Sequence, residues 1–167
     1  MKRSVAVVFC LIAGVALASD ADRAAVIGKW ATNDSIIDVV ERDGALHATI
    51  VSVLDPLYKE NEDGPVGTTR ADPKNPDPSL RTRPLVGIDL LSDYQFKDGK
   101  CQGSLYDPES GKTYKSQMTV DGKGKLQMRG YIGTPMFGRT QVWTPLSTCA
   151  GNIPRMLANV NMKEPCA

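Results

Sequence analysis

The chain has 167 residues and a nearly balanced charge, with 20 lysines and arginines against 19 aspartates and glutamates. The basic residues are scattered among acidic ones, so no basic stripe marks a nucleic-acid-binding surface and we expect no nucleic-acid partner. This length is typical of one domain, which can bury a core of useful size without a metal or cofactor.

The N-terminus has the three parts of a secretory signal peptide. Lys2 and Arg3 precede an apolar run over 4–15, and small residues at 16–18 form a cleavage pattern. We expect cleavage near Ala18, a mature chain 19–167 with 18 basic and 19 acidic side chains, and a location in the periplasm or outside the cell. The apolar run is shorter than the ~20 residues of a spanning helix, so we expect no membrane span.

The four cysteines fall in two groups. Cys10 lies within the predicted signal peptide, where a lipoprotein is the alternative interpretation, although Phe9 occupies a position at which a lipobox has a small residue. Cleavage leaves Cys101, Cys149 and Cys166 in a compartment where disulfides persist. Closing the short interval between Cys149 and Cys166 contributes about 3 kcal/mol in the chain-entropy model. We expect that disulfide, with Cys101 as a buried thiol, and spacing alone leaves the other two pairings open.

The body of the chain has the pattern of an all-β protein. Segments rich in β-branched and aromatic residues alternate with turn residues, and the turns at 42–44, 97–99, 108–111 and 121–124 are typical of hairpins. The predicted strands are 26–32, 35–42, 45–54, 85–91, 93–97, 100–106, 112–120, 124–132 and 138–144.

Alternation within the predicted strands gives each one an apolar face. In 45–54, for example, Leu46, Ala48 and Ile50 share one parity. Little helix is available to cover this face, so an antiparallel up-and-down sheet of about eight or nine strands hides it by closing into a barrel. A tight sandwich is the alternative.

Two regions interrupt the strands. Residues 55–84 hold six of the eleven prolines and lack apolar periodicity, which is typical of a long functional or disordered loop. The tail at 149–167 contains one short predicted helix, for which Asn152 is the cap and three apolar side chains are available for docking: Ile153, Leu157 and Val160.

Oxygen-bearing residues in the long loop offer a weak calcium candidate. Asp72, Asn75 and Asp77 lie within six residues and could help hold the ion. Capping of the turns between the neighbouring prolines is the alternative explanation, and the one that we favour.

Catalytic and zinc chemistry have little support. The only histidine, His47, has outward parity, so an exposed strand histidine is a better explanation than a Ser-His-Asp or Cys-His system. Asp107 and Glu109 could form a glycosidase-type pair, but the run from Asp107 to Gly111 is explained by a hairpin turn. We therefore expect no enzyme activity, and zinc lacks paired ligands.

Several runs resemble a known family. Gly103 to Tyr114, Arg129 to Gly133 and Gly138 to Trp143 resemble the exported bacterial family called domain of unknown function 2147, and the likeness continues at 28–30, 72–81 and 83–87. The resemblance implies a lipocalin-like barrel in the cell envelope and brings no established activity. The sequence departs from the family pattern at Cys101, where Trp is common, and at Pro145, where Arg is common.

The run Gly28-Lys29-Trp30 is also similar to the Gly-x-Trp signature of lipocalins. That resemblance implies that Trp30 closes the barrel floor and that the guanidinium of Arg139 lies over its indole ring. The alternative is a plain core tryptophan and an exposed strand arginine.

These patterns favour a monomeric binding module whose barrel takes a small, lipid-like apolar ligand behind the 55–84 loop. The residues expected to line that site are Trp30, Leu46, Ile50, Phe96, Leu105, Tyr114, Met118, Trp143 and Arg139. A cell-envelope interaction or structural protein with a filled barrel is the main alternative, and a carboxylate-based hydrolase is the third.

Overall fold

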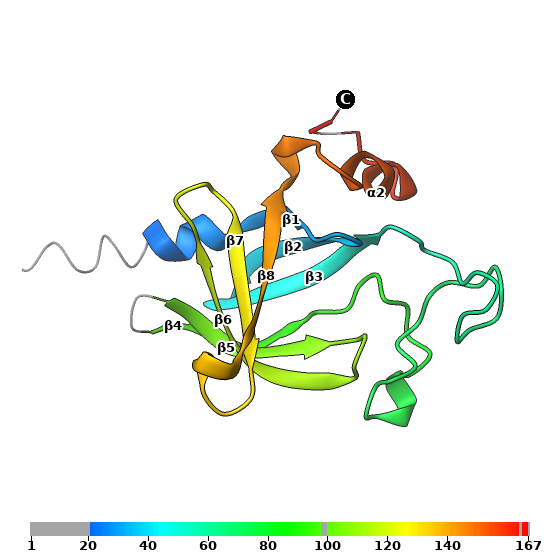
Figure 1. Ribbon diagram of the computed structural model, residues 1–167, viewed down its shortest axis with the longest axis horizontal. Coiled ribbons are helices and arrows are strands. Elements are labelled where there is room, and N and C mark those ends of the chain that lie inside the picture. The colour runs from blue at the N-terminus through cyan, green and yellow to red at the C-terminus, as the bar shows by residue number, and fades with distance from the viewer. Residues whose placement is uncertain (1–20, 98–99, 164, 167) are drawn as a thin grey trace, which may run out of the picture.

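The computed structural model describes residues 21–97, 100–163 and 165–166. The predicted signal peptide lies outside these residues. The described chain forms a nearly closed antiparallel barrel, as predicted (Figure 1). Its strands are β1 (Gly28–Ala31), β2 (Ser35–Arg42), β3 (Ala45–Val53), β4 (Leu91–Lys97), β5 (Lys100–Asp107), β6 (Lys112–Val120), β7 (Leu126–Tyr131) and β8 (Arg139–Pro145).

The strands are hydrogen-bonded in the order β3-β2-β1-β8-β7-β6-β5-β4, so two seams complete the barrel. At one seam β1 meets β8 through two pairs, Trp30 with Pro145 and Ala31 with Thr144. At the other seam the segment 87–90 lies between β3 and β5. The Leu90 N–H donates to Ala48 O at 2.8 Å, and Leu90 O accepts from the Tyr106 N–H at 2.8 Å.

The segment 85–91 is not the separate regular strand that the sequence predicted. A turn in which the Ile88 N–H donates to Leu85 O at 3.2 Å interrupts it, and β4 begins at Leu91. The segment still pairs with β3 through the isolated bridge between Thr49 and Asp89. The number of strands is therefore eight in the described chain, at the lower end of the expectation.

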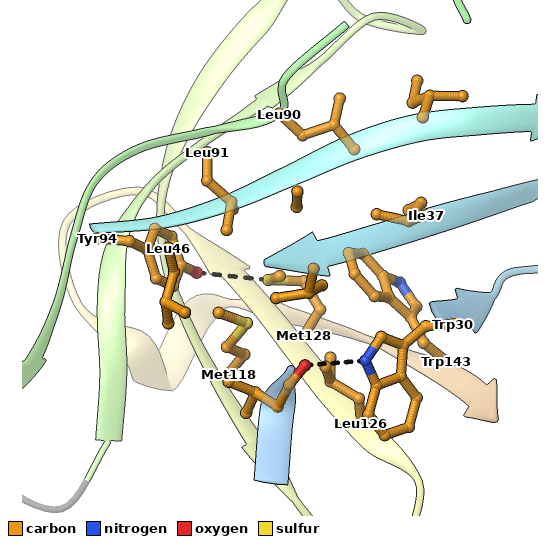
Figure 2. Packing of buried hydrophobic residues seen from close by; sticks show 14 of the residues in the cluster. Trp30, Ile37, Leu46, Leu90, Leu91, Tyr94, Met118, Leu126, Met128 and Trp143 are labelled. Atoms are coloured by element: carbon orange, nitrogen blue, oxygen red, sulfur yellow. Dashed lines mark hydrogen bonds between the residues drawn. The ribbon is translucent and has the colours of Figure 1, made fainter. Parts of the chain in front are cut away.

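Buried side chains fill the barrel interior (Figure 2). Leu46, Ala48 and Ile50 all point inward from β3, as their alternation predicted. The interior also holds polar groups that find partners there: the Tyr94 hydroxyl is 2.6 Å from Ser116 Oγ. Cys101 is a buried free thiol, as predicted, and burial raises its pKa to about 11. The largest fully buried side chains of the barrel include Trp143, Tyr94, Met118, Leu126 and Met128.

A helical segment at 21–26 precedes β1 and was not predicted. The expected strand start at 26 was wrong, because the alanine-rich segment before Gly28 has high helix propensity. Arg23 ties the helical segment to the β2–β3 hairpin: its Nη2 donates to Glu41 Oε1 at 2.7 Å and to Gly44 O at 2.6 Å.

The C-terminal tail packs against the outside of the barrel, as expected. Its helix α2 (Ile153–Asn159) follows the predicted disulfide cysteine Cys149, which is bonded to Cys166. Asn152 does not cap α2 through its side chain, because its Nδ2 donates to Asn33 O at 2.9 Å instead. The docking residues that α2 buries are Ile153, Met156 and Leu157, with Val160 only partly buried.

Within the described part of the chain, no helix has both the length and the apolar character needed to cross a membrane.

Candidate functional site

The long loop is organised around the carboxylate of Asp72, which is fully buried. Its Oδ2 accepts from Arg83 Nη2 at 2.8 Å and from Asn75 Nδ2 at 2.8 Å. Its Oδ1 accepts from the hydroxyl of Tyr106, on β5, at 2.7 Å. Removing a carboxylate from water is costly unless a cation and hydrogen bonds replace the water, and this set supplies both.

The surroundings of the Tyr106 hydroxyl raise its pKa above the ordinary value. Burial is the main cause that raises the pKa of Tyr106, and its hydrogen bond to Asp72 adds to the effect. The Arg83 guanidinium also lies over the Tyr106 ring, 5.5 Å from its centre. The phenol of Tyr106 and its cation–π contact with Arg83 thus fix the loop to the barrel wall, whereas the ion pair between Asp72 and Arg83 lies within the loop.

The three residues of the calcium candidate have separate partners. Asn75 turns its amide nitrogen toward Asp72, and its Oδ1 accepts from the Asp77 N–H at 2.9 Å. Asp77 caps the 3-10 helix η1 (Pro78–Leu80), because its Oδ1 accepts from the Ser79 N–H at 2.9 Å. This geometry agrees with the turn-capping alternative rather than with oxygens that converge on one ion.

A cleft of about 390 Å³ opens between the long loop and the β5–β6 turn. This volume lies within the range of ~300–1,000 Å³ that is typical of small-molecule sites. Its wall combines apolar and charged side chains: Tyr58, Pro73, Leu85 and Pro108 together with Glu62, Asp63, Arg70, Lys74 and Glu109.

The loop side of the cleft is held in place by Arg70. Its Nη2 donates to both carboxylate oxygens of Glu62, at 2.6 and 2.7 Å, and its Nε donates to Asp55 O at 2.6 Å. The same guanidinium lies 5.4 Å from the centre of the Tyr58 ring. The pKa of Glu62 is lowered from its ordinary value mainly by the hydrogen bond from the Lys59 N–H. The hydrogen bond from the Arg70 side chain is the next largest cause. The charge of Arg70 is therefore already neutralised within the wall.

The opposite side of the cleft is the β5–β6 turn. Asp107 Oδ1 accepts from the Glu109 N–H at 3.0 Å, and its Oδ2 accepts from the Ser110 hydroxyl at 2.6 Å, so the turn explanation holds for Asp107. A β-carbon at Gly111 would collide with the carbonyl oxygen of Lys74, so the loop docks where this turn has no side chain.

Glu109 lies in a region of negative potential. Burial is the largest cause that raises its pKa, and the charges of Asp34 and Asp107 raise it further. Lys74 is the opposing charge, and its effect is smaller. A cation that entered the cleft would relieve this repulsion.

The residues predicted to line an apolar ligand belong to the barrel core and its rim. Seven of the nine belong to the core cluster or pack against it, Arg139 is exposed, and the cleft is lined by different residues. In the buried core lie Trp30, Leu46, Ile50, Met118 and Trp143, whereas Phe96, Leu105 and Tyr114 are partly buried.

The stacked pair of Trp30 and Arg139 implied by the lipocalin signature is not formed. Trp30 pairs with Pro145, and Arg139 pairs with Gly130 at the far end of β8 and is exposed. A strand rises about 3.3 Å per residue, so an arginine cannot span the distance between them. The Trp30 indole instead donates to Val26 O at 2.9 Å, which is the core alternative.

His47 points outward from β3, as predicted, and its side chain is 32% exposed. Its Nδ1 lies 2.5 Å from Asp89 Oδ2, a partner that the sequence did not indicate. Asp89 also accepts from the Ala48 N–H at 2.9 Å, so the pair reinforces the seam between β3 and the segment 87–90.

Sequence reasoning missed most of the cleft. Tyr58, Arg70 and Lys74 lie in a segment without periodicity, where alternation gives no orientation. The only signal for the cleft was the composition of the proline-rich 55–84 loop, in which aromatic and charged residues recur.

Comparison with known proteins agrees with this architecture. Protein HP1028 from the human pathogen Helicobacter pylori, described as belonging to the lipocalin family, has a similar structure, with a TM-score of 0.60 and 24% sequence identity over 83% of this chain and 90% of that chain. At this identity the likeness shows the fold alone. No curated protein matches the chain. The family described as "Uncharacterized protein conserved in bacteria (DUF2147)" matches residues 28–145, well over half of the sequence. The chain is therefore a member of the DUF2147 family with a lipocalin-like barrel.

Proposed function

We propose that this protein binds a small amphipathic cation in the cleft between the long loop and the β5–β6 turn. The observation that carries the proposal is the cleft itself, with its volume of about 390 Å³ and its mixed apolar and acidic wall. Binding, rather than catalysis, would then be its activity. The sequence pattern over 1–18 supports a place of action in the periplasm or outside the cell.

Shape supports a ligand with an apolar body. Tyr58, Leu85 and two prolines offer the flat and aliphatic surface of the wall. Arg70, Glu62 and the Asp72 cluster hold the loop side in place before any ligand arrives. A site that is already ordered loses little conformational entropy on binding.

Charge supports a cationic group on that ligand. Three acids line the cleft against two basic residues, and the ion pair between Glu62 and Arg70 cancels one charge of each sign. Asp63 and Glu109 then remain against Lys74. The pKa of Glu109 is raised first by burial, and the neighbouring charges of Asp34 and Asp107 add to the effect.

The filled interior argues against the barrel core as the ligand site. Trp143 and Met118 are each only 1% exposed, and they pack within one continuous cluster of buried side chains. A ligand there would have to displace packed side chains, whereas the cleft is open. The expected apolar ligand is therefore replaced in this proposal by an amphipathic one.

The test uses three probes, each with an apolar octyl or phenyl group, that differ in the charge of the head group. Octyltrimethylammonium and phenethylamine carry a cation, and octanoate carries an anion. Isothermal titration of the protein purified from its native cells should give binding of the two cations and none of octanoate. Native mass spectrometry of the same protein identifies any molecule that copurifies.

Two matched variants locate the site. Glu109→Gln should weaken binding of the cations by about tenfold, the loss expected for one close charge pair. Glu60→Gln removes an exposed acid of the long loop that does not line the cleft, and it should leave affinity unchanged. Binding of octanoate alone, or binding that is lost in Met118→Ala but unaffected by Glu109→Gln, would move the ligand to the barrel core and overturn the proposal.

A further inference from the structure

The β7–β8 turn exposes an unusual group of apolar side chains. Ile132, Met136 and Phe137 are 74%, 79% and 80% exposed. Among the described residues, the next large apolar side chain is Val66, at 65%. Single exposed apolar residues are ordinary, but three within six positions of one turn form a patch that marks an interaction site.

The turn is held rigidly by the side chain of Arg129. Its Nε donates to Pro135 O at 2.8 Å, its Nη2 to Met136 O at 3.3 Å and its Nη1 to Thr140 Oγ1 at 2.8 Å. These bonds fix the 3-10 helix η2 (Pro135–Phe137) against the barrel wall. The apolar side chains are therefore exposed on a backbone that hydrogen bonds hold in place.

The stretch of sequence that contains the turn, from Lys112 to Pro145, has more basic than acidic residues. Between Lys112 and Pro145 the only acid is Asp121, which lies in the hairpin at the opposite end of β7. Next to the turn, Lys115 pairs with Tyr131, and Arg139 pairs with Gly130. The six basic residues of this stretch are Lys112, Lys115, Lys123, Lys125, Arg129 and Arg139.

We propose that the β7–β8 turn docks the protein on an anionic lipid bilayer. Ile132, Met136 and Phe137 enter the boundary between headgroups and acyl chains, while Lys115 and Arg139 meet the lipid phosphates. An apolar tip with cations beside it matches the two layers of that boundary, and each basic residue near an anionic surface adds to the attraction.

This surface is separate from the cleft. The long loop and the β7–β8 turn lie on different sides of the barrel, the loop at the right of Figure 1 and the turn at the lower left. None of the five residues assigned to the bilayer contact lines the cleft. The inference does not depend on the proposed ligand.

Vesicle cosedimentation tests the proposal with the protein purified from its native cells, its N-terminus determined by mass spectrometry. The protein should sediment with mixed vesicles of phosphatidylcholine and phosphatidylglycerol. It should sediment less with phosphatidylcholine alone, and high salt should weaken its binding to the mixed vesicles. Phe137→Ser should lower the partition coefficient on the order of tenfold, because the variant lacks the aromatic side chain that enters the bilayer.

Control variants distinguish insertion of the turn into the bilayer from nonspecific hydrophobic adsorption to vesicles. Val66→Ser removes an exposed apolar side chain from the long loop and should leave vesicle binding unchanged. Phe137→Trp adds a fluorophore at the tip, whose emission should shift to shorter wavelength with the mixed vesicles. Trp30 and Trp143 are buried and should contribute little to that change.

Three results would overturn the proposal. The first is an absence of sedimentation with the mixed vesicles. The second is sedimentation that Phe137→Ser does not reduce. The third is self-association or protein crosslinking that depends on Phe137 while the Phe137→Trp emission stays unchanged with vesicles, which would assign the turn to a protein partner.

Discussion

The Tyr106 hydroxyl donates to Asp72 across 34 residues of sequence, and this contact joins the long loop to the barrel wall. Asp72→Asn should lower the free energy of unfolding by about 3 kcal/mol, because Arg83 loses its carboxylate partner. This is the low end for a broken buried ion pair, since the Arg83 side chain is 32% exposed. Tyr106→Phe should cost less, about 1–2 kcal/mol, because it removes two hydrogen bonds of the hydroxyl, to Asp72 and from Asn75, but leaves the ion pair in place.

Urea unfolding followed by fluorescence measures both variants. Tyr114→Phe is a suitable control, because its hydroxyl lies 3.2 Å from Ser110 in an exposed turn contact. Equal stability of Asp72→Asn and the wild type would show that the cluster does not anchor the loop.

The disulfide should stabilise the tail and the whole domain. Replacing both Cys149 and Cys166 by Ser should lower the free energy of unfolding by about 3 kcal/mol, since the closed loop restricts the unfolded chain. Thermal unfolding with and without reductant gives the same comparison in the wild type. Cys101, buried and with a raised pKa, should resist thiol reagents until the protein unfolds.

Acid should loosen the loop wall of the cleft. The pKa of Glu62 is lowered in the folded state, so its contacts stabilise the loop above the ordinary pKa of a glutamate. That stabilisation is lost as the pH falls through the lowered folded pKa. The hydrogen-exchange protection factor of the Lys59 N–H, which donates to Glu62 at 2.7 Å, should fall over that interval. Protection that stays constant there, or that falls equally in Glu62→Gln, would contradict this account.

Ligand affinity should respond to a different group. The pKa of Glu109 is raised, so Glu109 protonates at a higher pH than an ordinary glutamate. A bound cation favours the ionised form, and its affinity should therefore be present above that raised pKa and disappear as the pH falls through it. Titrations of phenethylamine across this interval measure the effect. Glu109→Gln should bind weakly at every pH, and an unchanged pH profile in that variant would show that another group is responsible.

Met128→Ala should test the filled interior. Met128 is 1% exposed and packs in the barrel core, so its truncation should cost about 2–5 kcal/mol. A loss below 1 kcal/mol would mean that the interior collapses or is already loosely packed. Chemical denaturation with an unchanged m-value is the measurement.

Much of the barrel could be predicted because its signals are local. The alternation at Leu46 and Ile50 assigned the inward face of β3, and the turn residues at 108–111 located a hairpin. The short separation of Cys149 and Cys166 favoured their pairing, and this is the disulfide that forms. Each of these inferences needs only residues that are close together in the chain.

The rest depends on residues that meet from a distance. Nothing near Asp72 in the sequence indicates that Tyr106 donates to it, and the pairing of Asp89 with His47 spans 42 residues. The two arginine inferences illustrate the limit: Arg83 was not recognised as a partner of Asp72, while Arg139 was assigned to the wrong end of β8. Turn and strand chemistry fixes the local conformation but not which long side chains meet across the fold.

The seam between β1 and β8 joins the first strand to the last. A nascent chain therefore holds an unfinished sheet until Pro145, which pairs with Trp30, has left the ribosome. During that interval the apolar face of β1, β2 and β3 is not yet covered by the later strands of the barrel. Chaperones that hold unfolded chains bind exposed apolar surface of this kind. Pairing of β8 with β1 covers that surface and so removes their binding site.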